Sequence, residues 1–463
     1  MLALWSVHIL KQFKSVYFYT QNLNMGEKLN IYRKNFKVSD CLKPYLLRGG
    51  KYWDIKISKF INADIIIENG IIKDIGEFSS FNGKVVDTSG QVIFPGFMDM
   101  HVHFREPGRE DEETISTGST AASAGGFTAV CPMPNTDPVI DNQEMVRFVL
   151  EKGKDLITDI FPIGAISKNL KGEEISEIAD MVNAGIVALS DDGFPTANLG
   201  MMRRGMEYAN MFDIPVILHS EEKALSGEGV MNEGYYSTKL GLAGIPSISE
   251  EIAVIRNIMI AEYTGCRLHI AHVSTARSVE IIKNAKERGV KVTCEVTPHH
   301  LTLTDQCIET FNPNFKMNPP LRTEQDIEVI KNALKNGVID VIATDHAPHS
   351  IEEKELEFDK APFGIIGLET AFGIINEMLI NKNIITFENL TEKLITNPRN
   401  ILKLDIPEIK KNKRANLVII KLDKKWTVEN ENFFSISRNS PFVGMKLSGE
   451  IKGIFNKNKV WIR

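Results

Sequence analysis

The sequence predicts a (β/α)8 barrel of the TIM type, joined to a small β-sandwich domain that is formed from both termini. Three observations predict this fold. Short apolar strands alternate with helix-length segments eight times in the centre of the chain, both ends are rich in short strands, and polar residues collect where the central strands end. Such alternation is typical of a parallel sheet, and a barrel places its active site at the carboxyl ends of its strands.

The central strands are short apolar runs, and the segments between them have the length of helices. Examples of the expected helices are residues 174–184, 249–263, 276–289 and 323–337. An open doubly wound sheet is the alternative, but no G-x-G-x-x-G follows the first strand, so the usual nucleotide signature of that fold is missing. The eight strands are expected to end near His103, Asn135, Ser167, Asp192, Ser220, Ser274, His300 and His349.

Both ends of the chain alternate short apolar runs with Gly and Asn over residues 44–78 and 414–463, which is typical of β-hairpins. We therefore expect one small sheet domain built from both termini. Within the N-terminal extension, a start at Met25 is the alternative to Met1, because residues 1–24 lack the pattern of a secretory signal. The expected order is an extension without an assigned role (1–43), the first part of the β-sandwich (44–92), the barrel (93–403) and the second part (404–463).

The composition is that of a globular protein with a sizeable core. Apolar residues make up 43% of the chain, and a formal charge of −6 gives no reason to expect a nucleic-acid partner. The five cysteines form no C-x-x-C pair, and their odd number argues against a disulfide framework. No apolar run approaches the about 20 residues of a bilayer span, so we expect no membrane association and a cytoplasmic protein.

Candidate metal ligands stand at the ends of predicted strands. His101 and His103 form an H-x-H pair on the first strand, and because alternate strand residues share a face, both imidazoles can point to one metal. His219, His272 and Asp345 end strands five, six and eight. Four histidines and a carboxylate are more than one tetrahedral zinc ion uses, so we expect two ions that share a bridging ligand.

The bridging ligand is expected from the SDDG motif at the end of strand four. Adjacent strand residues face opposite sides, so only one of Asp191 and Asp192 can point inward, and this argument leaves the choice open. Two zinc ions would polarise a carbonyl and supply a nucleophile at neutral pH. Asp345 would take a proton from that nucleophile and pass it to the leaving amide nitrogen. The cluster therefore predicts hydrolysis of a C–N bond, run in either direction.

Substrate contacts are expected on the same rim of the barrel. Arg105 follows His103 by two residues and suits a substrate carboxylate, which a guanidinium binds bidentately; a salt bridge on the rim is the alternative. For the other polar groups at strand ends or in loops, capping of a loop is the alternative to substrate binding. These groups are Asn135, Asn318 and His349.

Other residues near the strand ends are assigned to structure rather than to chemistry. Cys131 has no partner base in the sequence and is expected to be a core thiol. His269 does not share the face of His272 and is expected to be structural, whereas His299 and His300 either line the site or buttress it. The segment FGIIG, from Phe363 to Gly367, can present bare backbone to a flat ring.

Two longer motifs resemble the signatures of the dihydroorotase family. DMHVHFREPG, from Asp99 to Gly108, is similar to the first signature, and ATDHAPH, from Ala343 to His349, is similar to the second. PMPNTDP, SDDG, ILHSEE, IAHVST, VTPHHL, KMNPPLR and FGIIGLET lie between or after them in the family's order. The resemblance covers about residues 44–463. It implies the reversible cyclisation of N-carbamoyl-L-aspartate to (S)-dihydroorotate in pyrimidine biosynthesis.

The resemblance also implies roles for individual residues. It makes Asp345 the general base and acid. The chain is similar to the branch that bridges its metals with an aspartate rather than a carboxylated lysine, and the spacing to His219 then selects Asp192. Two zinc ions per subunit are expected, with a single ion as the alternative. The implied zinc ligands are His101, His103, Asp192, His219, His272 and Asp345, and the implied substrate contacts are His103, Arg105, Asn135, Asn318, His349, Phe363 and Gly364.

Two other classes of protein are the alternatives. Allantoinase and hydantoinase-like dihydropyrimidinases share the barrel and the metal motif, but their rings lack the carboxylate that Arg105 would bind. A non-catalytic scaffold for aspartate carbamoyltransferase would have lost metal ligands, and all of them are present here. We expect a homodimer acting on a small molecule, with association with aspartate carbamoyltransferase as an option. Closure of the loop from Lys316 to Arg322 over the substrate is left open.

Overall fold

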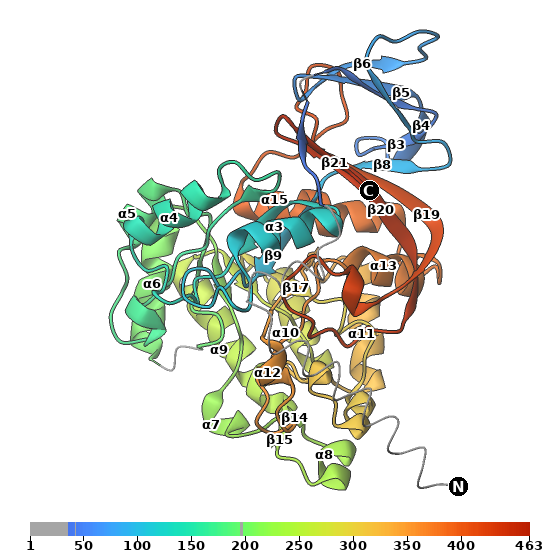
Figure 1. Ribbon diagram of the computed structural model, residues 1–463. Helices are drawn as coiled ribbons and strands as arrows, with labels where there is room; N and C mark the ends of the chain where they lie inside the picture. The colour runs from blue at the N-terminus through green and yellow to red at the C-terminus, as the bar shows by residue number, and fades with distance from the viewer. Residues whose placement is uncertain (1–35, 42, 195–197) are drawn as a thin grey trace, which may run out of the picture.

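The computed structural model describes residues 36–41, 43–194 and 198–463. Both alternative start residues, and most of the expected N-terminal extension, lie outside the described residues. Within these ranges, no helix is both long and apolar enough to cross a membrane. The chain folds into a helix-rich part, and strands from its two ends lie side by side above that part (Figure 1).

Eight parallel strands form a closed ring from two arcs. The first arc has the order β11-β10-β9, and the second has the order β12-β13-β16-β17-β18. Two parallel bridges close the ring, one between Gly164 and Leu189 and one between Val102 and His346. The predicted (β/α)8 barrel is therefore confirmed. Its strands are β9 (Phe97–Val102), β10 (Phe127–Pro132), β11 (Asp159–Ile160), β12 (Leu189–Ser190), β13 (Val216–Leu218), β16 (Leu268–Ile270), β17 (Val292–Val296) and β18 (Val341–Ile342).

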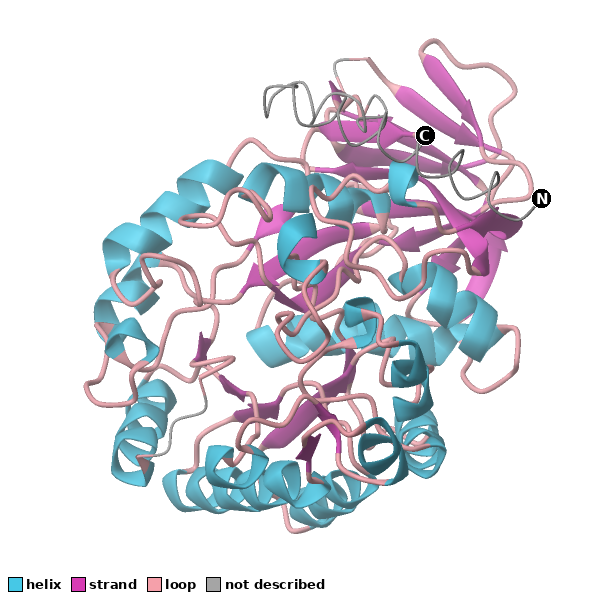
Figure 2. Cartoon of the chain, turned by 60° about the horizontal axis from the view of Figure 1, so that its bottom comes forward, coloured by secondary structure: helices cyan, strands magenta, loops and turns pink. Residues whose placement is uncertain are grey.

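The barrel strands are apolar on both faces because both faces are covered. Met100, Ile217 and Val341 pack with one another in the interior of the barrel. Their strand neighbours, such as Leu218 and Ile342, pack outward against the helices. Because side chains alternate along a strand, each apolar strand contributes residues both to the barrel interior and to the layer between the strands and the helices. Figure 2 shows the helices surrounding the strands.

Helices that follow the strands form the outer layer. Those expected at residues 174–184, 249–263, 276–289 and 323–337 are present as α5 (Ile178–Ala184), α9 (Ser247–Thr264), α10 (Ala276–Glu287) and α11 (Glu324–Lys335). Thr275 and Thr323 cap the last two, because each side chain accepts a hydrogen bond from a backbone amide of the first turn. The remaining helices include α3 (Ile115–Ala124), α4 (Gln143–Gly153), α6 (Leu199–Met211), α7 (Lys223–Ser226), α8 (Tyr235–Leu240), α12 (Ile351–Lys354), α13 (Ala371–Ile375), α14 (Phe387–Thr391) and α15 (Asn397–Leu402).

Two sheets from the ends of the chain form the second domain. A core that includes Tyr45, Ile65, Leu417 and Phe455 lies between them, so residues far apart in sequence share it. The larger sheet has the order β1 (Ser39–Asp40), β21 (Lys459–Ile462), β20 (Lys446–Asn456), β19 (Leu417–Thr427), β8 (Val92–Pro95), β3 (Lys51–Asp54) and β4 (Lys59–Asn62). The smaller has the order β6 (Ile71–Gly76), β5 (Asp64–Glu68), β2 (Tyr45–Arg48) and β7 (Lys84–Asp87).

Candidate active site

The histidines and carboxylates at the strand ends lie together at one mouth of the barrel. Nε2 of His101 is 3.5 Å from Oδ2 of Asp192 and 3.4 Å from Oδ1 of Asp345. Nε2 of His103 is 3.4 Å and 3.1 Å from the same two oxygens. On the other side of Asp192, its Oδ1 is 3.6 Å from Nε2 of His272. Three histidines from two strand ends thus surround Asp192, and two of them also contact Asp345.

His219 joins this cluster through His272. Its Nδ1 lies 3.1 Å from Nε2 of His272, and its Nε2 lies 3.1 Å from the carboxylate of Glu221. The amide of Asn318 donates to the same carboxylate over 3.1 Å. Glu221 was not singled out in the sequence, although it follows His219 by two residues and so shares its face. All six predicted zinc ligands, together with Asn318, are therefore gathered at one end of the barrel.

The two neighbouring aspartates of strand four point in different directions. Asp191 accepts hydrogen bonds from the backbone amides of Ile166 and Ser167, at 2.8 and 3.0 Å, and from the Ser167 hydroxyl at 2.6 Å. These bonds direct it toward the end of the third strand. Asp192, in contrast, lies among the histidines. The alternation of side chains along a strand is the physical reason for this division.

The chemistry of the cluster fits a metal centre. Nε2 of His101, Nδ1 of His272 and Oδ1 of Asp192 are buried and have no hydrogen-bond partner within the part of the chain that the structure describes, whereas buried polar atoms normally have one. Burial would raise the pKa of Asp192, but His101, His272 and His103 hold that pKa well below its usual value, so the carboxylate stays ionised. Imidazole and carboxylate donors suit zinc. Two groups of ligand atoms, each within 4.8 Å of one another, share His101: one with Asp192 and His272, the other with His103 and Asp345.

Glu295, a glutamate behind His101, is part of the site but was not among the candidate residues taken from the sequence. Glu295 in β17 lies with Oε1 2.7 Å from Nδ1 of His101 and with Oε2 3.1 Å from Nε2 of His269. Burial would raise the pKa of Glu295, but the two histidines outweigh it and lower the pKa to about 2. The N–H at Nδ1 of His101 therefore donates to a charged carboxylate, and Nε2 of that ring is left to face the cluster. An acidic residue within the apolar run VTCEV was the available signal.

Of the two histidines after β17, one buttresses a loop. His300 lies 2.9 Å from the carbonyl oxygen of Pro319 through Nε2, and 2.8 Å from the hydroxyl of Thr297 through Nδ1. It therefore supports the loop that carries Asn318. His299 is buried, and its Nε2 has no hydrogen-bond partner among the described residues. Burial, reinforced by the neighbouring His300, lowers its pKa well below the usual value, so the His299 ring is neutral.

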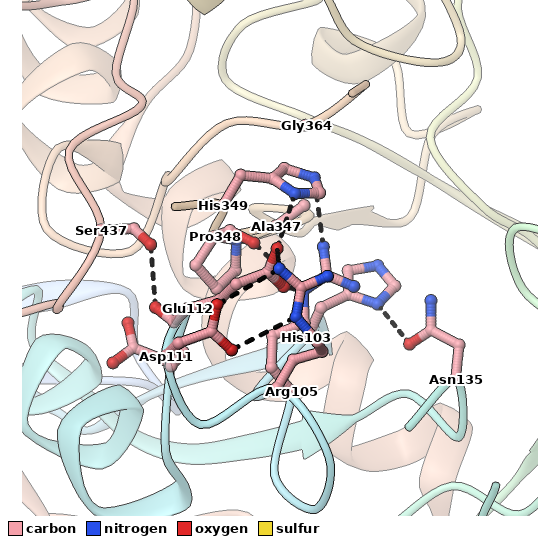
Figure 3. A network of polar contacts seen from close by, with 12 residues as sticks. His103, Arg105, Asp111, Glu112, Asn135, Ala347, Pro348, His349, Gly364 and Ser437 are labelled. Atoms are coloured by element: carbon pink, nitrogen blue, oxygen red, sulfur yellow. Dashed lines mark hydrogen bonds and ion pairs between the residues drawn. The ribbon is translucent and has the colours of Figure 1, made fainter. Parts of the chain in front are cut away.

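Arg105 lies on the rim beside His103, with Asn135 on the other side of that histidine (Figure 3). Nδ1 of His103 is 2.8 Å from the amide oxygen of Asn135. Nε of Arg105 donates to the carbonyl oxygen of Pro348 over 3.1 Å, and its Nη2 is 3.4 Å from Nε2 of His349. The residues expected to bind substrate on this side are therefore neighbours.

The loop at Phe363 and Gly364 closes this side of the site. Nε2 of His349 is 2.7 Å from the carbonyl oxygen of Phe363. Gly364 has a φ of +136°, and a Cβ there would lie 2.9 Å from both Ala347 and the ring of His349. Only glycine fits this close approach without a shift of its neighbours. The backbone of this loop is thus held directly against His349.

A segment from the second domain ties these loops together. The buried amide of Asn439 donates to the carbonyl oxygens of Ala347, at 2.9 Å, and Gly364, at 3.0 Å. Its own oxygen accepts a bond from the backbone amide of His349 over 3.3 Å. Asn439 was not singled out in the sequence, because nothing local to it indicates contacts with residues about ninety positions away.

Three site residues have left-handed backbone conformations. The φ angles are +57° at Arg105, +30° at His272 and +49° at Asp345. Residues other than glycine rarely adopt such angles, which cost about 1–3 kcal/mol each and cluster at functional sites. The surrounding structure therefore holds these three side chains in fixed directions.

Comparisons with known proteins agree with this architecture. A family model described as dihydro-orotase-like matches residues 90–278. A dihydroorotase of Acetivibrio thermocellus is 47% identical over 88% of this chain and 96% of its own, and one of Caldanaerobacter subterraneus is 49% identical over 84% and 91%. Among solved structures, an L-hydantoinase from Arthrobacter aurescens covers 90% of this chain and 95% of its own with a TM-score of 0.79 at 25% identity.

The fold and the cluster at the barrel mouth define a cyclic amidohydrolase. The hydantoinase structure shares the fold over nearly the whole length of both chains. Within that class, the identities of 47% and 49% over most of the chain show that this protein belongs to the dihydroorotase family.

Proposed function

We propose that this enzyme catalyses the reversible cyclisation of N-carbamoyl-L-aspartate to (S)-dihydroorotate and water, the dihydroorotase step of pyrimidine biosynthesis. One observation carries the proposal beyond the family: a guanidinium, that of Arg105, lies on the rim beside the histidine–carboxylate cluster, two residues from His103. A cluster suited to amide chemistry next to a carboxylate-binding group matches a ring that bears a carboxylate.

Zinc is the metal proposed for the cluster, with two ions per subunit and one ion as the alternative occupancy. Asp192 is proposed as the bridging carboxylate, since it lies between the His101–His103 pair and His272. When bound, such ions act as Lewis acids toward a carbonyl and make water acidic enough to react at neutral pH. The proposed ligands are His101, His103, Asp192, His219, His272 and Asp345.

Asp345 is proposed as the residue that moves the proton. Its Oδ1 contacts both His101 and His103. The Asp345 side chain is 13% exposed, compared with 0% for His101, 5% for His103 and 6% for Asp192. Burial would raise its pKa, but His101 and His103 hold that pKa well below the usual value, so the carboxylate is ionised and carries no proton of its own. In ring opening it would take a proton from the attacking water and deliver it to the ring nitrogen that leaves.

The substrate is proposed to lie between the cluster and the rim. Arg105 would bind its carboxylate through charge-assisted hydrogen bonds. Asn135 and Asn318 lie on opposite sides of the cluster, next to His103 and His219 respectively, and would orient the ring. The remaining proposed contacts are His103, His349 and the backbone of Phe363 and Gly364.

The sister reactions are not favoured. The L-hydantoinase and a dihydropyrimidinase from Brevibacillus agri share the fold at 25% and 22% identity, well below the dihydroorotases. A scaffold without activity is not favoured either, because all proposed ligands are present and gathered at one mouth.

The decisive experiment measures ring opening of dihydroorotate by the purified protein, with zinc and after chelation, beside allantoin and dihydrouracil. Zinc-dependent turnover of dihydroorotate alone is the expected result. Turnover of an uncharged ring instead would keep the amidohydrolase class and discard the dihydroorotase assignment. No turnover of any ring would favour the scaffold interpretation.

A homodimer in a reducing cytoplasm is proposed as the form in which the enzyme works, with association with aspartate carbamoyltransferase as an option. The five cysteines are all free thiols, which is typical of that compartment. An apolar stripe runs along the outer face of α9, where Met259 is 64% and Tyr263 71% exposed. Exposed apolar patches mark interaction sites, and a symmetric dimer would cover this one on both subunits. The stripe consists of Ile248, Ile252, Ile255, Met259 and Tyr263.

A further inference from the structure

Glu112 is a buried carboxylate on the substrate side of the barrel mouth that the proposed chemistry does not use. It is 2% exposed. The chain turns back between Arg105 and Glu112, because the backbone amide of Arg109 donates to the carbonyl of Arg105 and that of Glu112 donates to the carbonyl of Arg109, both over 3.0 Å. This turn brings Glu112 beside Arg105, which lies seven positions earlier in the sequence.

Glu112 holds one edge of the Arg105 guanidinium. Its Oε2 is 3.1 Å from Nε of Arg105, and the Pro348 carbonyl oxygen accepts from the same nitrogen at 3.1 Å. Among the described residues, Glu112 is the carboxylate that forms an ion pair with Arg105. A guanidinium is planar and offers donors along two edges that suit a carboxylate. Because the Nε side is occupied, the edge formed by Nη1 and Nη2 is the one left for a substrate carboxylate.

The same carboxylate also holds His349. Its Oε1 is 3.0 Å from Nδ1 of that ring, and the opposite nitrogen then faces both the Phe363 carbonyl oxygen, at 2.7 Å, and Nη2 of Arg105, at 3.4 Å. Figure 3 shows Glu112 beside Arg105, on the side away from the contact of His103 with Asn135. One buried glutamate therefore sets the directions of two groups on the substrate side.

The position of Glu112 is itself fixed from two further sides. Nη2 of Arg109 lies 3.1 Å from its Oε1. The Ser437 hydroxyl, from the segment of the second domain, donates to its backbone carbonyl over 2.8 Å. A carboxylate fixed in this way, rather than a mobile one, can impose an orientation on its partners.

We propose that Glu112 is a positioning residue for the substrate carboxylate: it orients the guanidinium of Arg105 and the ring of His349, and so sets the preference for a carboxylated ring over an uncharged one. The proposal rests on the proposed function, in which Arg105 binds that carboxylate. Among the described residues, Glu112 forms no hydrogen bond or ion pair with any of the proposed zinc ligands. Its effect is therefore expected on binding of the carboxylate and not on the chemical step.

The test compares Glu112→Gln and Glu112→Ala with wild type, using dihydroorotate turnover and inhibition by orotate, a planar ring with the same carboxylate. Glu112→Gln keeps the shape but loses the charge. We expect KM for dihydroorotate and the inhibition constant of orotate to rise about tenfold, as for loss of one hydrogen bond to a charged group, with kcat within about threefold. Glu112→Ala is expected to have a larger effect in the same direction.

The matched control is Glu110→Gln, which removes a nearby carboxylate. Glu110 is exposed, and its side chain accepts a hydrogen bond from the backbone amide of Gly108. Among the described residues it forms no ion pair with Arg105 or Arg109 and no hydrogen bond with His349, so both constants should stay at the wild-type values. Zinc content and melting temperature are measured for every variant, and the isosteric Glu112→Gln keeps the test valid if Glu112→Ala does not fold. Unchanged constants in Glu112→Gln, or a fall in kcat as large as the rise in KM, would overturn the proposal. If wild type does not turn over dihydroorotate, the proposed function fails, and binding of orotate by calorimetry then tests Glu112 separately.

Discussion

Glu295 lies directly behind His101, with its Oε1 2.7 Å from Nδ1 of the ring, on the side away from Asp192 and Asp345. The carboxylate is fully buried and is shared with His269. It therefore determines which nitrogen of His101 carries the proton and which is left for a metal ion. This relationship leads to a prediction about metal affinity.

Glu295→Gln is expected to weaken zinc binding about 10- to 100-fold, because the partner behind a metal-binding histidine fixes its tautomer and raises its basicity. Competition with a chromophoric chelator measures the affinity. Thr293, which contacts His269 and not His101, supplies the control: Thr293→Val should leave zinc affinity within about twofold, since it touches no proposed ligand. Equal zinc affinity in Glu295→Gln and wild type would contradict the role assigned to this contact.

Asp345→Ala is expected to leave the fold intact and to abolish turnover of dihydroorotate. The side chain accepts the proton of the attacking water in the proposed mechanism, and general bases contribute about 10²–10⁴-fold to a rate. Circular dichroism and zinc content show whether the fold and the cluster remain. Activity near that of wild type in a folded, zinc-loaded variant would refute the mechanism.

Arg105→Ala is expected to weaken binding of dihydroorotate by about 2–5 kcal/mol, as for truncation of one partner of a buried charge pair. The loss should be found in KM, since the guanidinium contacts the substrate carboxylate rather than the reacting carbonyl. Arg105→Lys should recover only part of it, because an ammonium cannot make the planar bidentate contact. An unchanged affinity in Arg105→Ala would exclude this residue from the carboxylate site.

Substitutions of the two neighbouring aspartates at the end of strand four are expected to have different effects. Asp192→Asn should lose zinc and activity while the melting temperature of the metal-free protein changes little. Asp191→Asn should keep zinc but lose about 1–3 kcal/mol of stability, because Asp191 accepts three hydrogen bonds from Ile166 and Ser167. Chemical denaturation and metal analysis of both variants distinguish the two outcomes. The reverse pattern would exchange their roles.

Met259→Glu is expected to convert a dimer into a monomer, because it places a charge in the apolar stripe of α9. Sedimentation velocity measures the state of assembly. Ile57→Glu is the matched control, since Ile57 is also exposed, at 54%, but lies in the sandwich domain. A dimer that persists in Met259→Glu would place the interface on another face.

The barrel and most of the cluster were predictable from the sequence. Each apolar strand is followed by a helical segment, and a parallel ring brings all carboxyl ends to one mouth, so His101, His219, His272 and Asp345 had to meet there once the strands were recognised. The formation of one sandwich from both termini was predictable for a similar reason, since both ends show the same alternation of short apolar runs with Gly and Asn. Both features follow from the periodic pattern of apolar residues, which is visible in the sequence itself.

The tertiary structure decided the contacts that depend on distance and direction. Which of Asp191 and Asp192 faces the histidines depends on the twist at the end of one short strand. Glu295 contacts His101 from 194 positions away in the sequence, and Asn439 contacts Gly364 from 75 positions away. No local pattern records such meetings, because they are made by loops whose paths are set by packing against other parts of the chain. The sequence could therefore indicate the reaction, whereas the fold was needed to show what orients the residues proposed to perform it.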